Sequence, residues 1–288
     1  AFNSEKSVTK IEVNVPTEYL PSWVKADVFD PPDFIEHILK EISIGTVMPF
    51  ISDQMVYGKH LGVKHVKKRL AEPNDDKINS LREKVLHITE WACKEGIFAP
   101  KGIYQWFKAT TEEDSLLLHD QNKVQLASFE FPRQEKAGGI SAVDWIRPED
   151  RGGDAICMFV VTSGSDTVDA AAMMREEGRF LDSHILQAVG IELAEATAEW
   201  IHQKIRAEWG YNDSKDKTLD DLFRTNYRGI RLSFGYPACP DLNAQEDLFR
   251  LLKPERVGVK LTEGMMMSPE GSVSALVFHH PDGMYYSI

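Results

Sequence analysis

The chain has 288 residues, of which 42% are hydrophobic and 27% charged, a balance that indicates a globular protein and excludes a disordered or fibrous one. Its formal net charge of −12 repels phosphate backbones, so no nucleic acid partner is expected. No apolar run reaches the ~20 residues of a membrane helix, so we expect no membrane partner, and three widely spaced cysteines fit a reducing cytoplasm.

The first half of the chain predicts an arm, two helices and a group of strands. Residues 1–30 are expected to form a proline-punctuated N-terminal arm, and residues 31–288 a single domain. Residues 31–42 predict a helix, because Pro32 suits a first turn and Asp33 complements the helix dipole. A second helix is predicted over about 74–95, closed by Gly96. Residues 102–134 alternate β-branched and aromatic with polar residues, as in a meander of antiparallel strands.

The second half adds a long helix between strands. The apolar run at 155–162 predicts a buried strand, and residues 181–209 predict a long helix on which Glu192, Glu195 and Glu199 follow one stripe. That stripe is expected to line a surface or a cleft. A short helix at 244–252 and strands at 256–263 and 272–281 complete the chain. Without a regular βαβ alternation, these elements predict the α+β class with an antiparallel sheet.

One stretch departs from the acidic average. Residues 59–70 read "KHLGVKHVKKRL" and contain the cations Lys59, Lys64, Lys67, Lys68 and Arg69 together with His60 and His65. Such a run is usually a solvated helical face. The alternative hypothesis is a docking surface for an acidic partner.

Several common sites are absent from the sequence. No G-x-G-x-x-G or G-x-x-x-x-G-K-[ST] occurs, so neither a dinucleotide fingerprint nor a P-loop is present. The histidines lack the spacing of a helical metal motif, so no metal site is predicted. Residues 227–241, "YRGIRLSFGYPACPD", contain two glycines and two prolines, break both the helical and the strand period, and predict a stiff loop around Arg231.

That loop carries a family resemblance. Its Arg-x-x-x-Gly-Tyr-Pro, together with "ELAEATAEWIHQKIRAEWGY", "GVKLTEGMMMSPEGSVSALVFHHPDGMYY" and "FPRQ", resembles the C-terminal activation domain of cobalamin-dependent methionine synthase. The resemblance covers roughly the last two thirds of the chain, with the segments in family order. It implies a long, curved antiparallel sheet flanked by helices, a bound S-adenosylmethionine, and reductive methylation of cob(II)alamin to methylcobalamin. The electron would come from flavodoxin or a similar acidic reductase.

The resemblance also implies a binding site for S-adenosylmethionine, made of Arg231, Ser233, Gly235, Tyr236, Glu195 and Tyr285. An arginine can bind the ligand carboxylate through two parallel hydrogen bonds. Glu195 suits the cationic side of the ligand, Tyr236 offers a flat ring, and Gly235 permits a positive φ. Arg231 is expected to have no buried partner in the empty protein, and no side chain is assigned as catalytic.

The N-terminal third matches the family less well. The acidic residue that the family carries ahead of its Pro-Phe pair is replaced by Thr46, and Asp53 is the candidate substitute. Nothing resembles the homocysteine, folate or cobalamin modules, so the chain is not expected to make methionine alone, and a cobalamin-binding domain is expected in cis or in trans. Two alternatives stay open: a non-catalytic module that caps a corrinoid-binding domain, and a methyltransferase for a small molecule, which the missing glycine-rich loop disfavours.

Overall fold

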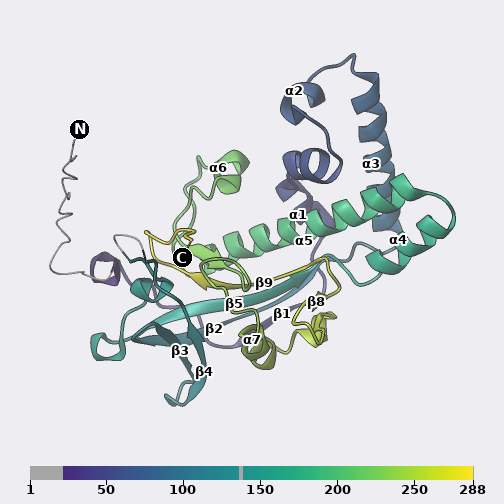
Figure 1. Ribbon diagram of the computed structural model, residues 1–288. Coiled ribbons are helices and arrows are strands. Elements are labelled where there is room, and N and C mark those ends of the chain that lie inside the picture. Colours follow the sequence, from purple (N-terminus) through teal and green to yellow (C-terminus); the bar gives the residue numbers. More distant parts are fainter. Residues whose placement is uncertain (1–21, 136–138, 288) are drawn as a thin grey trace, which may run out of the picture.

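The computed structural model describes residues 22–135 and 139–287, so most of the predicted arm lies outside the described residues. Its centre is a seven-stranded sheet with the order β4-β3-β2-β5-β9-β6, in which β1 also pairs with β2 (Figure 1). All pairs are antiparallel. The strands are β1 (Glu36–Leu39), β2 (Lys101–Glu112), β3 (Ser115–His119), β4 (Gln125–Glu130), β5 (Asp154–Thr162), β6 (Ile230–Leu232) and β9 (Ser272–Phe278), and a separate pair is formed by β7 (Lys260–Leu261) and β8 (Met267–Ser268). The predicted α+β class, meander and buried strand are confirmed.

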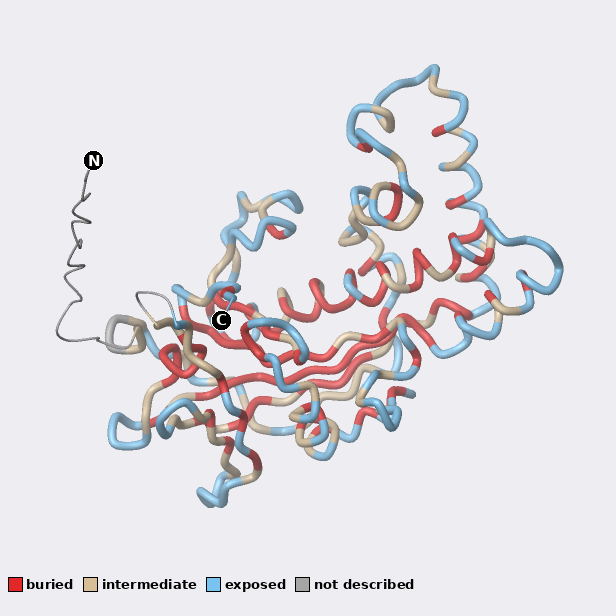
Figure 2. The backbone as a smooth tube through the Cα atoms, in the orientation of Figure 1, coloured by how far each residue is buried: buried red, intermediate tan, exposed pale blue. Residues whose placement is uncertain are grey.

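Both faces of the sheet are covered. The 29-residue helix α5 (Phe180–Glu208) crosses one face, where Ile201 and Ile205 pack with Trp106 and Phe159 of the sheet. Helix α7 (Gln245–Leu252) lies on the opposite face (Figure 1). As a result β5 is buried along nearly its whole length (Figure 2). The predicted long helix and the predicted short helix at 244–252 are therefore confirmed.

A lobe of short helices packs on the N-terminal half of α5 (Figure 1). Ile185, Val189 and Leu193 of α5 share one apolar cluster with this lobe. The lobe comprises α1 (Ile44–Val47), the 3-10 turn η2 (Met48–Phe50), the π-helix η3 (Gln54–His60), α2 (Val66–Leu70) and α3 (Asp76–Lys94). Helix α3 confirms the prediction over 74–95, and the Asp75 side chain caps it by accepting from the Ile78 N–H.

The remaining elements connect these layers. They are α4 (Thr167–Glu176), α6 (Leu219–Phe223) and the 3-10 turns η1 (Ser22–Lys25), η4 (Ala142–Trp145), η5 (Glu149–Arg151) and η6 (Pro254–Val257). None of the helices in the described ranges is long and apolar enough to cross a membrane.

Two predicted elements are wrong. The helix expected over 31–42 is replaced by strand β1, whose residues pair with residues 102–105 of β2, because sheet hydrogen bonds outweigh a local helix preference in so short a segment. The strand expected over 256–263 shrinks to Lys260–Leu261. Its first residues belong to the turn η6, which ends at Gly258 with a φ of 88°.

Candidate functional site

A pocket of about 490 Å³ opens where the edge strand β6 meets α5 and the C-terminal segment. Five of the six predicted binding residues line it: Glu195, Arg231, Ser233, Tyr236 and Tyr285. The floor is apolar and includes Ala238 and Val273. A mostly apolar pocket of this size with a few converging polar groups is typical of a small-molecule site.

Arg231 lies on strand β6, so the prediction of a loop for the whole of 227–241 is wrong at this point. It pairs with Val277 of β9 at the edge of the sheet. Ile230 and Leu232 on either side face the core that α7 covers, and the alternation of a strand turns Arg231 toward α5. The core residues that flank Arg231 therefore fix the direction of its side chain.

Arg231 has a buried partner, contrary to the sequence-based expectation. Its Nη1 donates to Glu199 Oε2 at 2.7 Å and lies 3.4 Å from both His202 Nδ1 and the Tyr227 hydroxyl. The side chains of Arg231 and Glu199 are 15% and 9% exposed. Burial disfavours the charged form of Arg231 and so lowers its pKa. The carboxylate of Glu199 and other neighbours raise the pKa by more, so the pKa of Arg231 is raised.

Only one of the three guanidinium nitrogens is used by these contacts. Nη2 and Nε of Arg231 make no hydrogen bond to any described residue. Neither atom is among the buried atoms that lack a partner, so both are accessible. Both therefore remain open to the pocket. This leaves a two-pronged donor that matches one carboxylate.

A second layer of buried groups supports Arg231 from behind. Arg206 is fully buried, pairs with Asp213 at 2.6 Å and lies 3.9 Å from the centre of the Tyr227 ring. Burial, and then the charges of Arg206 and Arg231, lower the pKa of His202 well below its usual value, which keeps its ring neutral. Sequence reasoning missed this layer. The signal available was Glu199, one turn after Glu195 on the same stripe of α5.

The segment after β6 forms a tight turn. Gly235 has a φ of 81°, as predicted for this glycine, and its N–H donates to the Cys239 carbonyl at 2.9 Å. The Ser233 hydroxyl donates to the Ser274 carbonyl at 2.8 Å, so its oxygen stays available as an acceptor. Tyr236 is 64% exposed at the rim. Gly235 thus shapes the turn, and it is the one predicted site residue that does not line the pocket.

Glu195 and Tyr285 complete the wall. Glu195 is exposed, but the surrounding protein removes part of the water around its carboxyl group, and this raises the pKa of Glu195. The positive charge of Arg231 lowers that pKa, whereas the negative charges of Glu192 and Glu199 raise it. The net result is a raised pKa. Burial likewise raises the pKa of Tyr285, whose phenol therefore keeps its proton at neutral pH. A carboxylate and an arginine fork thus face one cavity.

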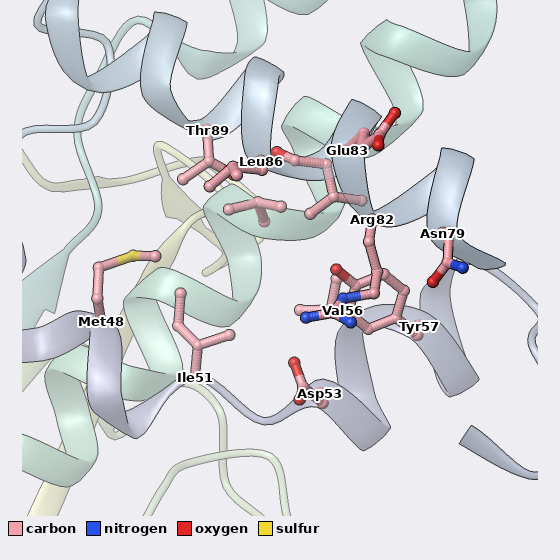
Figure 3. A pocket seen from close by; sticks show the side chains of 12 residues that line it. Met48, Ile51, Asp53, Val56, Tyr57, Asn79, Arg82, Glu83, Leu86 and Thr89 are labelled. Carbon is pink, nitrogen blue, oxygen red and sulfur yellow. Dashed lines mark hydrogen bonds between the residues drawn. The ribbon is translucent and has the colours of Figure 1, made fainter. Parts of the chain in front are cut away.

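The proposed substitute for the missing acidic residue is not in this pocket. Neither Thr46 nor Asp53 lines it, and Asp53 lines a different cavity between η3 and α3 (Figure 3). No part of the short-helix lobe contributes to the lining around Arg231.

Comparison with known proteins agrees with this architecture. The family described as "Vitamin B12 dependent methionine synthase, activation domain" matches residues 52–288. The chain belongs to this family. The activation-domain match includes β6, α5 and the C-terminal segment, and hence every residue that lines the pocket.

Similar proteins include methionine synthases of Mycobacterium leprae and Mycobacterium tuberculosis, each 27% identical over 274 residues. These matches cover 90% of this activation domain but 23% of each relative, so the chain spans about a quarter of their length. Among solved structures, the crystal structure of the MetH reactivation domain bound to AdoHcy is similar, with a TM-score of 0.84 and 27% identity. That match covers 92% of this chain and 84% of the other.

Proposed function

We propose that this activation domain binds S-adenosylmethionine in the pocket around Arg231 and presents its methyl group to a cobalamin carried by another domain or protein. The observation that carries the proposal is the open Nη2–Nε fork of Arg231, which faces the same pocket as Glu195. The fork suits the ligand carboxylate and Glu195 suits its ammonium. The structural relative that binds AdoHcy, which is the same ligand without the methyl group, supports this assignment.

The chemistry needs little from the protein beyond positioning. The cobalamin of the partner, once reduced by an electron from the reductase, would supply the nucleophile that accepts the methyl group. No proton has to leave, so no general base is required, and the side chains have to hold the sulfonium in one orientation. Arg231 and Glu195 would fix the amino acid end, while the exposed rings of Tyr236 and Tyr285 would flank the adenosine at the rim.

The partners follow from this role. A cobalamin-binding domain would contact the rim, in cis within a longer methionine synthase or in trans, and we place the reaction in the cytoplasm. The module would reactivate the enzyme after oxidation of its cobalamin and would not make methionine by itself. The alternative remains a capping module that holds a corrinoid-binding domain in one conformation without using S-adenosylmethionine.

Calorimetric titration of the isolated chain separates the two roles. We expect S-adenosylmethionine to bind with modest affinity, corresponding to about −4 to −8 kcal/mol. We expect AdoHcy to bind as well, because it carries the same carboxylate and ammonium. Absence of heat and of a thermal shift with millimolar ligand would contradict the proposal and leave the capping role.

The basic stretch 59–70 is the proposed contact for an acidic reductase such as flavodoxin. Lys59, Lys64, Lys67 and Lys68 are exposed, whereas Arg69 is held by Asp75 at 2.7 Å and is better left intact. Changing Lys64, Lys67 and Lys68 to glutamate should weaken flavodoxin binding roughly ten-fold at low ionic strength and much less at high ionic strength.

A matched control keeps the net charge change but moves it. Lys215, Lys253 and Lys260 are exposed elsewhere on the chain, and their triple change to glutamate should have a much smaller effect. Equal weakening by both triple variants would show that only the net charge matters and that residues 59–70 are an ordinary solvated face.

A further inference from the structure

A second cavity lies in the lobe of short helices, apart from the pocket around Arg231. It has a volume of about 500 Å³ and lies between the segment Met48–Tyr57, helix α3 and helix α5 (Figure 3). The two cavities share no lining residue. On α5, Val189 lines this one and Glu195 the other, and six residues of helix correspond to about 9 Å along the axis.

One side of this cavity is apolar. Met48 and Ile51 line it from the segment Met48–Tyr57, and Leu86 lines it from α3 (Figure 3). Leu86 on α3 is 57% exposed, so part of this apolar side is in contact with water. An apolar group of a ligand would remove this surface from water.

The other side is polar and holds one cation and two carboxylates, which belong to the exposed residues Arg82, Asp53 and Glu83. Arg82 and Asp53 both line it, and neither makes an ion pair or a hydrogen bond with another residue in the described parts of the chain (Figure 3). Tyr57 lies beside them and is 7% exposed, yet its hydroxyl has no partner among the described residues. Burial raises the pKa of Tyr57, Asp53 raises it further and Arg82 lowers it, so the phenol is a hydrogen-bond donor at neutral pH. The Tyr57 hydroxyl is not one of the buried atoms that lack a partner, so it is accessible from the cavity and can donate a hydrogen bond to a ligand there.

The backbone at this wall is unusual as well. Tyr57 and Val56 belong to η3, a seven-residue π-helix. Such turns are rare and occur frequently at functional sites. This is evidence independent of the charges, because it concerns the main chain.

We propose that this cavity binds a small zwitterionic α-amino acid with an apolar side chain. Arg82 and Tyr57 receive the carboxylate, Asp53 receives the ammonium, and the apolar side takes the side chain of the ligand. Each part of such a molecule has a complementary group in the wall, whereas a purely apolar ligand would leave Asp53, Tyr57 and Arg82 unused. The site is separate from the one proposed for S-adenosylmethionine.

The test uses L-leucine and three analogues that each lack one part: 3-methylbutylamine without the carboxylate, 4-methylpentanoate without the ammonium, and glycine without the apolar chain. Binding is followed through the NMR methyl signal of Met48, with the methyl of Met266, next to the Arg231 pocket, as the internal reference. We expect leucine to shift Met48 and not Met266, and each analogue to bind at least about ten-fold more weakly.

Two variants keep the test decisive. Arg82→Gln should weaken leucine binding about ten-fold, and Tyr57→Phe should weaken it less, because the ring is kept. The matched control Arg224→Gln changes an exposed arginine that directly follows α6, and it should leave leucine binding unchanged. No variant should alter binding of S-adenosylmethionine. The proposal is overturned if leucine leaves Met48 unshifted, if the analogues bind as well as leucine, or if Arg82→Gln behaves like Arg224→Gln.

Discussion

Arg231→Ala is expected to weaken the binding of S-adenosylmethionine by roughly thirty-fold to a thousand-fold. Truncating one partner of a hydrogen-bonded charge pair in a partly desolvated site costs about 2 to 4 kcal/mol, and each factor of ten corresponds to about 1.4 kcal/mol. The readout is the dissociation constant for S-adenosylmethionine beside that for decarboxylated S-adenosylmethionine. The second ligand lacks the group that Arg231 binds, so its affinity should change by no more than a few-fold.

The same variant should also lose stability. Removing Arg231 leaves the Glu199 carboxylate buried and unpaired, and breaking such a pair costs about 3 kcal/mol.

A double variant separates the two effects. Arg231→Ala combined with Glu199→Gln removes the stranded charge, so the free energy of unfolding should recover in part while the affinity for S-adenosylmethionine stays low. An Arg231→Ala protein that unfolds early but binds normally would assign Arg231 a purely structural role. A stable protein that has lost binding would show that the Glu199 pair contributes little to folding.

The sequence predicted the long elements well because their signals are local. Helices at 74–95 and 181–209 extend over many turns, so their periodicity and end signals outweigh single exceptions. Strand β1 failed for the opposite reason, because four residues at the edge of β2 depend on a partner more than 60 positions along the chain. Short elements held by distant partners cannot be read from their own residues.

The site shows the same division. The Arg-x-x-x-Gly-Tyr pattern brought Arg231, Gly235 and Tyr236 into view as one group. The pairing of Arg231 with Glu199 joins residues 32 positions apart through the packing of α5 on the sheet, and no spacing rule predicts it. The cavity at Tyr57 and Arg82 likewise exists because three helical segments meet, which is a property of the assembled lobe.

Glu199 raises a question of its own, because it holds the group that is proposed to bind the ligand. With S-adenosylmethionine bound, Arg231 would lie between the carboxylate of Glu199 and that of the ligand. Two carboxylates on opposite sides of one guanidinium are about 6 Å apart, and their repulsion is about 3 kcal/mol at an effective dielectric constant of about 20. If Arg231 binds the ligand as proposed, Glu199 would stabilise the empty protein and reduce the affinity for the ligand carboxylate.

Glu199→Gln is accordingly expected to act in opposite directions on folding and on binding. The free energy of unfolding should fall by about 2 kcal/mol, because Arg231 keeps a hydrogen-bond acceptor but loses its counter-ion. The preference for S-adenosylmethionine over decarboxylated S-adenosylmethionine should rise about ten- to hundred-fold, because the repulsion disappears for the first ligand alone. Both dissociation constants are measured by calorimetry at one ionic strength, with Glu192→Gln as a matched change on the same helix stripe that lies outside the pocket lining.

An unchanged or lower preference in Glu199→Gln would mean that Arg231 does not contact the ligand carboxylate. Failure of the parent chain to bind S-adenosylmethionine would instead refute the proposed function itself.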